Sequence, residues 1–168
     1  MIRRQNQIFL RPLELADLGT YVSWGRDRRF CEYAGWTVDR PAAELEAHWL
    51  ALIEQPKSDH LRLAAVAGDE VVGYVDLAGA EPDRRELGYV VGPSDRWGRG
   101  LGGILARLGV EYGFDVLRLR EIWAEAVDAN RASVRILASL GMTEIGRGED
   151  ESFLGVASYY RRFAISRP

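Results

Sequence analysis

The residues best placed for chemistry are the glycines of Trp97–Gly103, where four glycines fall within six residues. The segment follows the apolar run Leu87–Val91 and opens the amphipathic stretch Leu101–Phe114. Backbone N–H groups at glycines can approach an anion closely, and the first turn of a helix adds unpaired donors and a partial positive charge. Arg96 and Arg99 bring cationic side chains to the same place. The pattern predicts a phosphate-binding turn, with a glycine-rich connection that binds nothing as the alternative.

The same glycines also satisfy the G-x-G-x-x-G pattern of dinucleotide-binding folds, over Gly98–Gly103. In those folds the glycines directly follow the first strand of a parallel unit. Here a predicted antiparallel hairpin comes first, and Gly92–Trp97 separates strand from glycines. The Gly-Lys-Ser/Thr of a nucleotide-hydrolase loop is absent from this segment. A nucleotide-binding domain stays open as the less favoured alternative.

Length and composition indicate one globular domain. The chain has 168 residues, of which 47% are apolar and 28% charged, enough for a substantial core. Its formal net charge of −3 implies no general affinity for nucleic acid or an acidic membrane, so neither is expected as a partner. The slight acidic excess favours a cationic small molecule or a basic peptide over a polyanion.

Metal sites and disulfides are not expected. Cys31 is the only cysteine, and His48 and His60 are the only histidines. The segment Met1–Gln7 lacks the apolar centre of a signal peptide, and no apolar run reaches the length of a membrane span. The sequence therefore predicts a cytoplasmic protein without a metal cofactor.

Hydrophobic periodicity and turn residues divide the chain into predicted strands and helices. Strands are predicted at 8–12, 61–67, 71–77, 85–91, 119–127, 142–145 and 152–165, and helices at 13–24, 41–55, 101–114 and 132–140. Residues 26–40, which are rich in aromatic side chains, are predicted to be irregular. Consecutive strands in the middle of the chain, with helices around them, indicate an α+β protein with a mixed sheet in three layers.

Three motifs together resemble the GNAT family of acetyl-CoA-dependent N-acetyltransferases. The family's loop reads Q/R-x-x-G-x-G/A, and Trp97–Gly102 matches it except at its first position. An aromatic residue there is similar to the ribosomal-protein N-acetyltransferase (RimJ/RimL-like) branch, as is the opening Phe9–Leu18. Asn130–Val134 leading to Leu140–Met142 is similar to the family's N-x-x-S…L-G-F. The resemblance spans residues 7–165 and implies a single N-acetyltransferase domain over that range.

The resemblance implies the GNAT fold, a mixed and mostly antiparallel sheet of about seven strands with helices on both faces. Its fourth and fifth strands, at 85–91 and 119–127, would splay apart and hold acetyl-CoA as co-substrate. The residues implied to bind it are Val90, Val91, Gly92, Gly98, Arg99, Gly100, Leu101, Gly102, Gly103 and Asn130. Backbone N–H groups of the glycines would hold the pyrophosphate, and the strand residues would pair with the pantetheine arm. Asn130 would hydrogen-bond that arm, cap the following helix, or do both.

Acyl transfer to an amine needs a base, because a protonated amine has no lone pair to attack with. The resemblance points to two glutamates on the splayed strands. Glu86 occupies the position of the basic glutamate in histone-modifying members, and Glu125 that of another ribosomal-protein acetyltransferase branch. Glu125 is slightly favoured, since burial in its apolar strand would raise its pKa. For each, a solvated or salt-bridged structural carboxylate is the alternative, and water could relay the proton.

The leaving thiolate would benefit from a nearby donor. Many GNAT members place a tyrosine seven residues after the asparagine, but this chain has Leu137 there. Ser133, one helical turn after Asn130, is the predicted substitute as a hydrogen-bond donor to the sulfur. Tyr33 and Trp36 lie where the family builds its acceptor pocket, with a small satellite core as the alternative for these aromatics.

The sequence thus favours an enzyme that moves acetyl from acetyl-CoA to a primary amine by direct attack, with a glutamate or a water-relayed base. The acceptor is expected to be a small-molecule amine or a peptide or protein N-terminus, and the protein a monomer or homodimer. Two alternatives remain: a non-catalytic acyl-CoA-binding sensor on the same fold, and a nucleotide-binding domain that uses the glycine loop.

Overall fold

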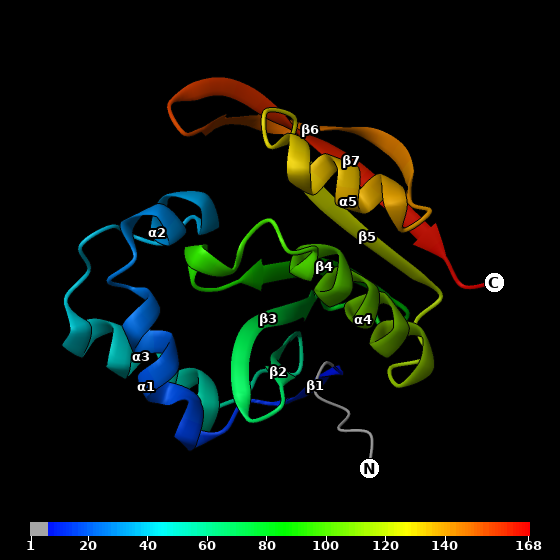
Figure 1. Ribbon diagram of the computed structural model, residues 1–168. Helices are drawn as coiled ribbons and strands as arrows, with labels where there is room; N and C mark the ends of the chain where they lie inside the picture. Colours follow the sequence, from blue (N-terminus) through cyan, green and yellow to red (C-terminus); the bar gives the residue numbers. More distant parts are fainter. Residues whose placement is uncertain (1–6) are drawn as a thin grey trace, which may run out of the picture.

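The computed structural model describes residues 7–168, and its centre is a seven-stranded mixed sheet in the order β1-β2-β3-β4-β5-β7-β6 (Figure 1). The strands are β1 (Ile8–Pro12), β2 (His60–Ala67), β3 (Glu70–Ala78), β4 (Arg84–Val91), β5 (Glu121–Val127), β6 (Thr143–Phe153) and β7 (Val156–Ser166). The α-helices are α1 (Leu18–Trp24), α2 (Arg28–Ala34), α3 (Ala42–Glu54), α4 (Leu101–Asp115) and α5 (Arg131–Ser139), with short 3-10 helices at Leu15–Asp17 and Ser94–Arg96. The α+β architecture expected from the sequence is confirmed.

All neighbouring strands run antiparallel except β4 and β5, which run parallel. Their pairing covers only three residue pairs, Arg84–Glu86 with Glu121–Trp123. Beyond Glu86 and Trp123 the two strands diverge toward the side of the molecule where α2 lies (Figure 1). We call this divergence the fork. It confirms the predicted splay between the fourth and fifth strands.

One face of the sheet is covered by α4 and α5. Leu105 of α4 and Leu137 of α5 are fully buried there against the inward side chains of the central strands. The axis of α4 lies close to the sheet because Gly109 and Gly113 carry no side chain. A Cβ at Gly109 would come within 2.5 Å of Leu87 Cδ1. These glycines therefore hold the first turn of α4 beside the end of β4.

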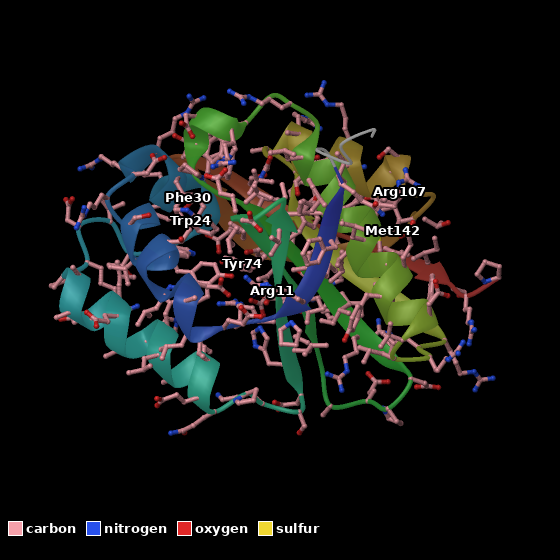
Figure 2. The ribbon with its side chains drawn as sticks, turned by 60° about the horizontal axis from the view of Figure 1, so that its bottom comes forward. Arg11, Trp24, Phe30, Tyr74, Arg107 and Met142 are labelled. Carbon is pink, nitrogen blue, oxygen red and sulfur yellow. The ribbon has the colours of Figure 1, made fainter. Side chains whose placement is uncertain are left out.

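The other face is covered by α1, α2 and α3 through a largely aromatic cluster. Tyr21 stacks on Trp49 with ring centroids 4.0 Å apart, and Trp24 meets Phe30 edge-on at 5.6 Å. Figure 2 shows Trp24 and Phe30 beside the N-terminal helices, with Tyr74 between those helices and the sheet. Of the two strands that form the fork, β4 is thus packed from both sides.

The segment 26–40 departs from its predicted irregular structure, because Arg28–Ala34 forms α2. Asp27 caps this helix by accepting a hydrogen bond from Phe30 N–H at 3.0 Å, and Gly35 ends it with a φ of +71°. Both end signals are present in the sequence. A helix of seven residues is nevertheless too short to show a clear apolar period.

The last two strands also differ from the prediction. β6 extends over Thr143–Phe153 instead of 142–145, and β7 begins at Val156 instead of residue 152, with Leu154 and Gly155 in the turn. The polar residues 147–151 suggested a loop. They fit a strand because β6 lies at the edge of the sheet and is mostly exposed.

Two expectations concerned membrane segments and metals. Within residues 7–168, no helix is long and apolar enough to cross a bilayer. Over the same range, no three His, Cys, Asp or Glu side chains gather in a way that could hold a metal ion. Residues 1–6, which carry most of the segment examined for a signal peptide, lie outside the described residues.

We expect Gly73→Ala to destabilise the fold, because its Cβ would overlap the Val90 carbonyl oxygen and lie 2.5 Å from Leu105 Cδ2. The expected loss is about 1–3 kcal/mol in the free energy of unfolding, measured by urea denaturation. Gly19→Ala is the matched control: its Cβ would meet nothing within 4 Å, so α1 should gain about 0.5–1 kcal/mol. Equal effects at the two positions would contradict the packing described.

Candidate active site

A cavity of about 610 Å³ lies at the fork, between the ends of β4 and α2 on one side and the starts of α4 and α5 on the other. We call it the main cavity. Its lining residues are Tyr33, Ala34, Tyr89, Val90, Val91, Trp97, Gly98, Gly100, Leu101, Gly102, Gly103, Asn130, Ala132, Ser133, Arg135, Ile136 and Ser139. Most of the residues that the sequence singled out for the co-substrate are therefore brought together.

The glycine loop, Trp97–Gly103, presents a row of unpaired backbone donors to this cavity. Across residues 7–168, no hydrogen-bond acceptor serves any N–H group from Gly98 to Gly103. Gly98 and Gly100 both have a φ of +77°, which side-chain-bearing residues rarely adopt. A Cβ at either glycine, or at Gly103, would meet nothing within 4 Å. The loop thus leaves open space in front of donors suited to an anion.

Trp97 fixes the start of the glycine loop to the end of β4. Its indole Nε1–H donates to the Val91 carbonyl oxygen at 2.9 Å, and the Arg29 guanidinium lies 5.3 Å from its ring centroid. The adjacent Arg96 is ion-paired with Glu70, the first residue of β3, and β3 is the strand that neighbours β4. The aromatic residue at the head of the loop is therefore a structural anchor.

Asp27 joins α2 to the same loop region. Its Oδ1 accepts the Phe30 N–H that caps α2, while its Oδ2 accepts the N–H of Ser94 at 2.8 Å. Burial alone would raise the pKa of Asp27, but the hydrogen bonds from Phe30 and Ser94 outweigh it and the pKa is lowered. One carboxylate thus holds both a helix start and the approach to the glycine loop.

The edge of β4 that faces the fork differs from the expected one. The Gly92 N–H donates to Val72 O at 3.1 Å, so Gly92 pairs with β3. Backbone groups alternate sides along a strand. Those of Val90 therefore also face β3, and those of Tyr89 and Val91 face the fork. Of the three strand residues expected to pair with the co-substrate, Val91 keeps that orientation, whereas Val90 and Gly92 do not.

Asn130 and Ser133 occupy the first turn of α5. Asn130 Oδ1 accepts the Ser133 N–H at 3.3 Å and so caps the helix, while both residues line the main cavity. The Ser133 hydroxyl lies 2.9 Å from the hydroxyl of Tyr89 on β4. Leu137, at the position where a tyrosine was looked for, is buried. The sequence did not point to Tyr89 as a site residue. Strand alternation predicts which face of the sheet its side chain occupies, but not that its hydroxyl lies beside Ser133.

The two candidate glutamates lie outside the main cavity lining. Leu87 and Ala124 pack toward α4, so the neighbouring Glu86 and Glu125 point to the opposite face of the sheet. Glu125 accepts a hydrogen bond from Arg162 Nε at 3.1 Å. Burial raises the pKa of Glu86 and the charge of Glu125 raises it further, while Arg162 opposes them. The two strands that form the fork therefore carry these carboxylates on one face of the sheet, and β4 carries the cavity residue Tyr89 on the other.

The three remaining candidate residues differ in whether they line the main cavity. Arg99 is outside the cavity lining and donates to the Asp95 carbonyl oxygen at 3.4 Å. Tyr33 lines the main cavity and packs against Trp97, with ring centroids 4.9 Å apart. Trp36 lines a separate cavity of about 310 Å³, where its Nε1–H donates to the Tyr74 hydroxyl.

A model of one protein family, described as an acetyltransferase (GNAT) domain, matches residues 7–143. The chain belongs to the GNAT acetyltransferase family. It is an acetyl-CoA-dependent N-acetyltransferase, and the resemblance drawn from three short motifs is confirmed at the level of the family. Its assignment to the RimJ/RimL-like branch stays a prediction.

One curated relative and two solved structures are similar to this GNAT domain. The chain is 25% identical over 145 residues to the uncharacterized N-acetyltransferase p20 of Bacillus licheniformis, covering 83% of this chain and 81% of that one. The crystal structure of spermidine N-acetyltransferase from Vibrio cholerae, in complex with CoA and spermine, superposes with a TM-score of 0.80 at 22% identity, over 95% of each chain. A GNAT-family acetyltransferase from Bacillus anthracis gives 0.78 at 17% identity, over 99% and 98% of the chains. These two structures share the fold of this chain.

We expect Asp27→Ala to lower the free energy of unfolding of this GNAT domain by about 1–2 kcal/mol, because the cap of α2 and the tie to Ser94 are both lost. A carboxyl with a lowered pKa stabilises the fold above its unfolded pKa of about 3.9, and that contribution disappears as pH falls through the folded value. The difference from wild type, measured by urea denaturation at several pH values, should therefore shrink below about pH 4. Asp27→Asn, which can still cap, should lose less, and equal losses in the two variants would contradict the capping role.

Proposed function

We propose that the protein transfers the acetyl group of acetyl-CoA to a primary amine of a small molecule that carries positive charge. The observation that carries the proposal is the arrangement at the fork. A row of free backbone donors and a cavity of about 610 Å³ lie on one side, and a carboxyl with a raised pKa lies on the other. Acyl transfer needs both an anchored thioester and a base, and β4 carries residues of both places, with Glu86 on one face of the sheet and Tyr89 on the other.

The residues present fit acetyl-CoA. The N–H groups of Gly98–Gly103 would hold the pyrophosphate, because they have no other acceptor in the described chain and the start of α4 favours negative charge. The fork-facing backbone of Tyr89 and Val91 would pair with the pantetheine arm, and Asn130 would contact that arm from α5. Bound there, acetyl-CoA supplies an activated acetyl group as a thioester.

Glu86 is the base we favour. A protonated amine must lose a proton before it can attack, and a carboxyl whose pKa is raised accepts that proton more readily than an ordinary one. Glu125 is held by Arg162, so it orients its neighbours and raises the pKa of Glu86. A backbone N–H that the fork leaves without a strand partner, from Tyr89 or Val91, would stabilise the charge that develops on the thioester oxygen.

Carboxylates gather around Tyr160 on the face of the sheet that carries Glu86 and Glu125, which we call the acceptor side. Burial raises the pKa of Tyr160, and the nearby carboxylates Glu151, Glu125, Glu86 and Glu149 raise it further. These charges would attract a cationic acceptor to the base. The Vibrio cholerae neighbour acts on spermidine, an acceptor of that chemistry.

Gly103→Leu should abolish CoA binding without unfolding the chain. The Cβ of residue 103 would meet nothing within 4 Å and its φ is ordinary for a helix, so a side chain there fits the fold but enters the main cavity. In the wild type, CoA at about 100 times its Kd should stabilise the protein by about 2.7 kcal/mol. That gain, read as a rise in Tm, should vanish in the variant, whose Tm without CoA stays near the wild-type value. An unchanged response to CoA would place the phosphates elsewhere.

Glu86→Gln should lower kcat about 100-fold or more while leaving CoA binding unchanged, measured by thiol release from acetyl-CoA with spermidine, a peptide N-terminus or a neutral amine as acceptor. Glu125→Gln is the matched control and should lose less. A base at Glu125 would reverse this order, and CoA binding by the wild type without turnover of any amine would favour a sensor over an enzyme.

The same Glu86→Gln variant should be more stable than wild type near about pH 7. A carboxyl with a raised folded pKa contributes its full stability only below its unfolded pKa of about 4.3, and that contribution is lost as pH rises through the folded pKa. The stability difference in urea denaturation should therefore disappear near about pH 4. A variant less stable than wild type at both pH values would contradict the conclusion that the ionised Glu86 carboxylate destabilises the fold.

A further inference from the structure

The hydroxyl groups of Tyr89 and Ser133 form a pair across the fork. Tyr89 comes from β4 and Ser133 from the first turn of α5, their oxygens are 2.9 Å apart, and both residues line the main cavity. Tyr89 is half-buried, and its side chain points toward the α4 and α5 face, where it packs on the hydrophobic cluster. The pair joins β4 to α5, the two walls that would enclose the end of the pantetheine arm.

Hydrogen-bond geometry leaves either hydroxyl as the donor, and acidity favours Tyr89, because a phenol is a stronger acid and a stronger donor than an aliphatic alcohol. Burial raises the pKa of Tyr89, against a smaller opposing effect of its hydrogen bond with Ser133, so the phenol keeps its proton at neutral and mildly alkaline pH. The backbone N–H of Ser133 is already used by Asn130 Oδ1, which fixes the serine on the helix. A phenol that donates to Ser133 Oγ leaves the serine's own proton free to point into the cavity.

We propose that Tyr89 is a positioning residue for departure of the CoA thiolate: its hydroxyl donates to Ser133 Oγ and turns the Ser133 proton toward the sulfur. This rests on the proposed acetyl transfer from acetyl-CoA. In that reaction the amine nitrogen bonds to the acetyl carbon, the carbon–sulfur bond breaks, and its electron pair stays on sulfur. A protonated amine releases two protons in all: Glu86 takes the one lost before attack, and the one lost from the nitrogen after attack passes to water.

The pair supplies a hydrogen bond and does not transfer its proton. A thiol with an ordinary pKa of about 8.5 is a stronger acid than a phenol whose pKa burial raises above its ordinary value, so the thiolate cannot take the phenol's proton to completion. The sulfur is reprotonated from water after CoA leaves. The two hydroxyls lower the free energy of the developing thiolate, which is how a chain with Leu137 in α5 can provide a donor near the sulfur.

A double-mutant cycle separates this role from simple packing of β4 against α5. Ser133→Ala should lower kcat about 100-fold and Tyr89→Phe about tenfold, each with a KM for acetyl-CoA within about twofold of wild type. The double variant should be no slower than Ser133→Ala alone, because Tyr89 acts through Ser133. Tyr112→Phe, which removes a phenol hydroxyl from α4 outside the cavity lining, should change neither constant. Additive losses, or a rise in KM with unchanged kcat, would overturn the proposal.

A second measurement needs no acceptor and no turnover. The pKa of the thiol of bound CoA can be followed by the ultraviolet absorption of the thiolate in the saturated complex. We expect a value below that of free CoA in wild type and a return toward the free value in Tyr89→Phe and Ser133→Ala. Arg135, the charged side chain in the cavity lining, is present in every variant, so its field cancels in the comparison.

The two readouts distinguish the failure of this proposal from that of the proposed function. A lowered thiol pKa that depends on Tyr89, in a protein that acetylates no amine, supports the pair and overturns the acetyl transfer. Turnover of an amine with a thiol pKa and a kcat that are the same in wild type and Tyr89→Phe supports the enzyme and overturns the pair. Absence of CoA binding by the wild type overturns both.

Discussion

The parallel ladder between β4 and β5 stops after three residue pairs, and the candidate active site depends on where it stops. The backbone N–H and C=O groups of a strand inside a sheet normally form hydrogen bonds with both neighbouring strands. Beyond Glu86, β4 keeps its bonds to β3 but has no strand partner on its other side within residues 7–168, where Trp97 satisfies the Val91 carbonyl oxygen and leaves the other backbone groups free. Those unsatisfied groups make the end of β4 an edge in the middle of the sheet, and an extended ligand can pair with that edge as a strand would.

Packing on both faces keeps the fork open. α4 is drawn onto the sheet by Gly109 and Gly113, and its first turn then lies beside the end of β4. On the other face the aromatic cluster around Trp24 and Trp49 supports the same strand, where a Cβ on Gly92 would collide with the Trp24 ring. The strands cannot close the ladder without displacing these contacts. The energetic cost of an unpaired strand edge is therefore balanced by burial of large side chains.

The features visible in the sequence are those whose cause is local. The glycine loop, the hairpin at Gly68 and the cap at Asn130 each depend on residues a few positions apart, and each is found where predicted. α2 and the length of β6 were missed because a short helix and an exposed edge strand have weak apolar periods. The side-chain contacts between distant strands and helices could not be predicted from the sequence. The contact of Tyr89 with Ser133 joins residues 44 positions apart, and that of Glu125 with Arg162 joins residues 37 apart, so they exist only once the topology is known.

The double role of Asp27 has a thermodynamic consequence. Because one carboxylate holds both the N–H of Phe30 in α2 and the N–H of Ser94 ahead of the glycine loop, the two segments cannot be ordered independently. A ligand that stabilises the loop must also stabilise α2, and a ligand that contacts α2 must help the loop by the same free energy, since linkage is reciprocal. Tyr33 of α2 already lines the main cavity. A ligand in the main cavity that contacts Tyr33 would therefore also stabilise the approach to the glycine loop, through a helix of seven residues.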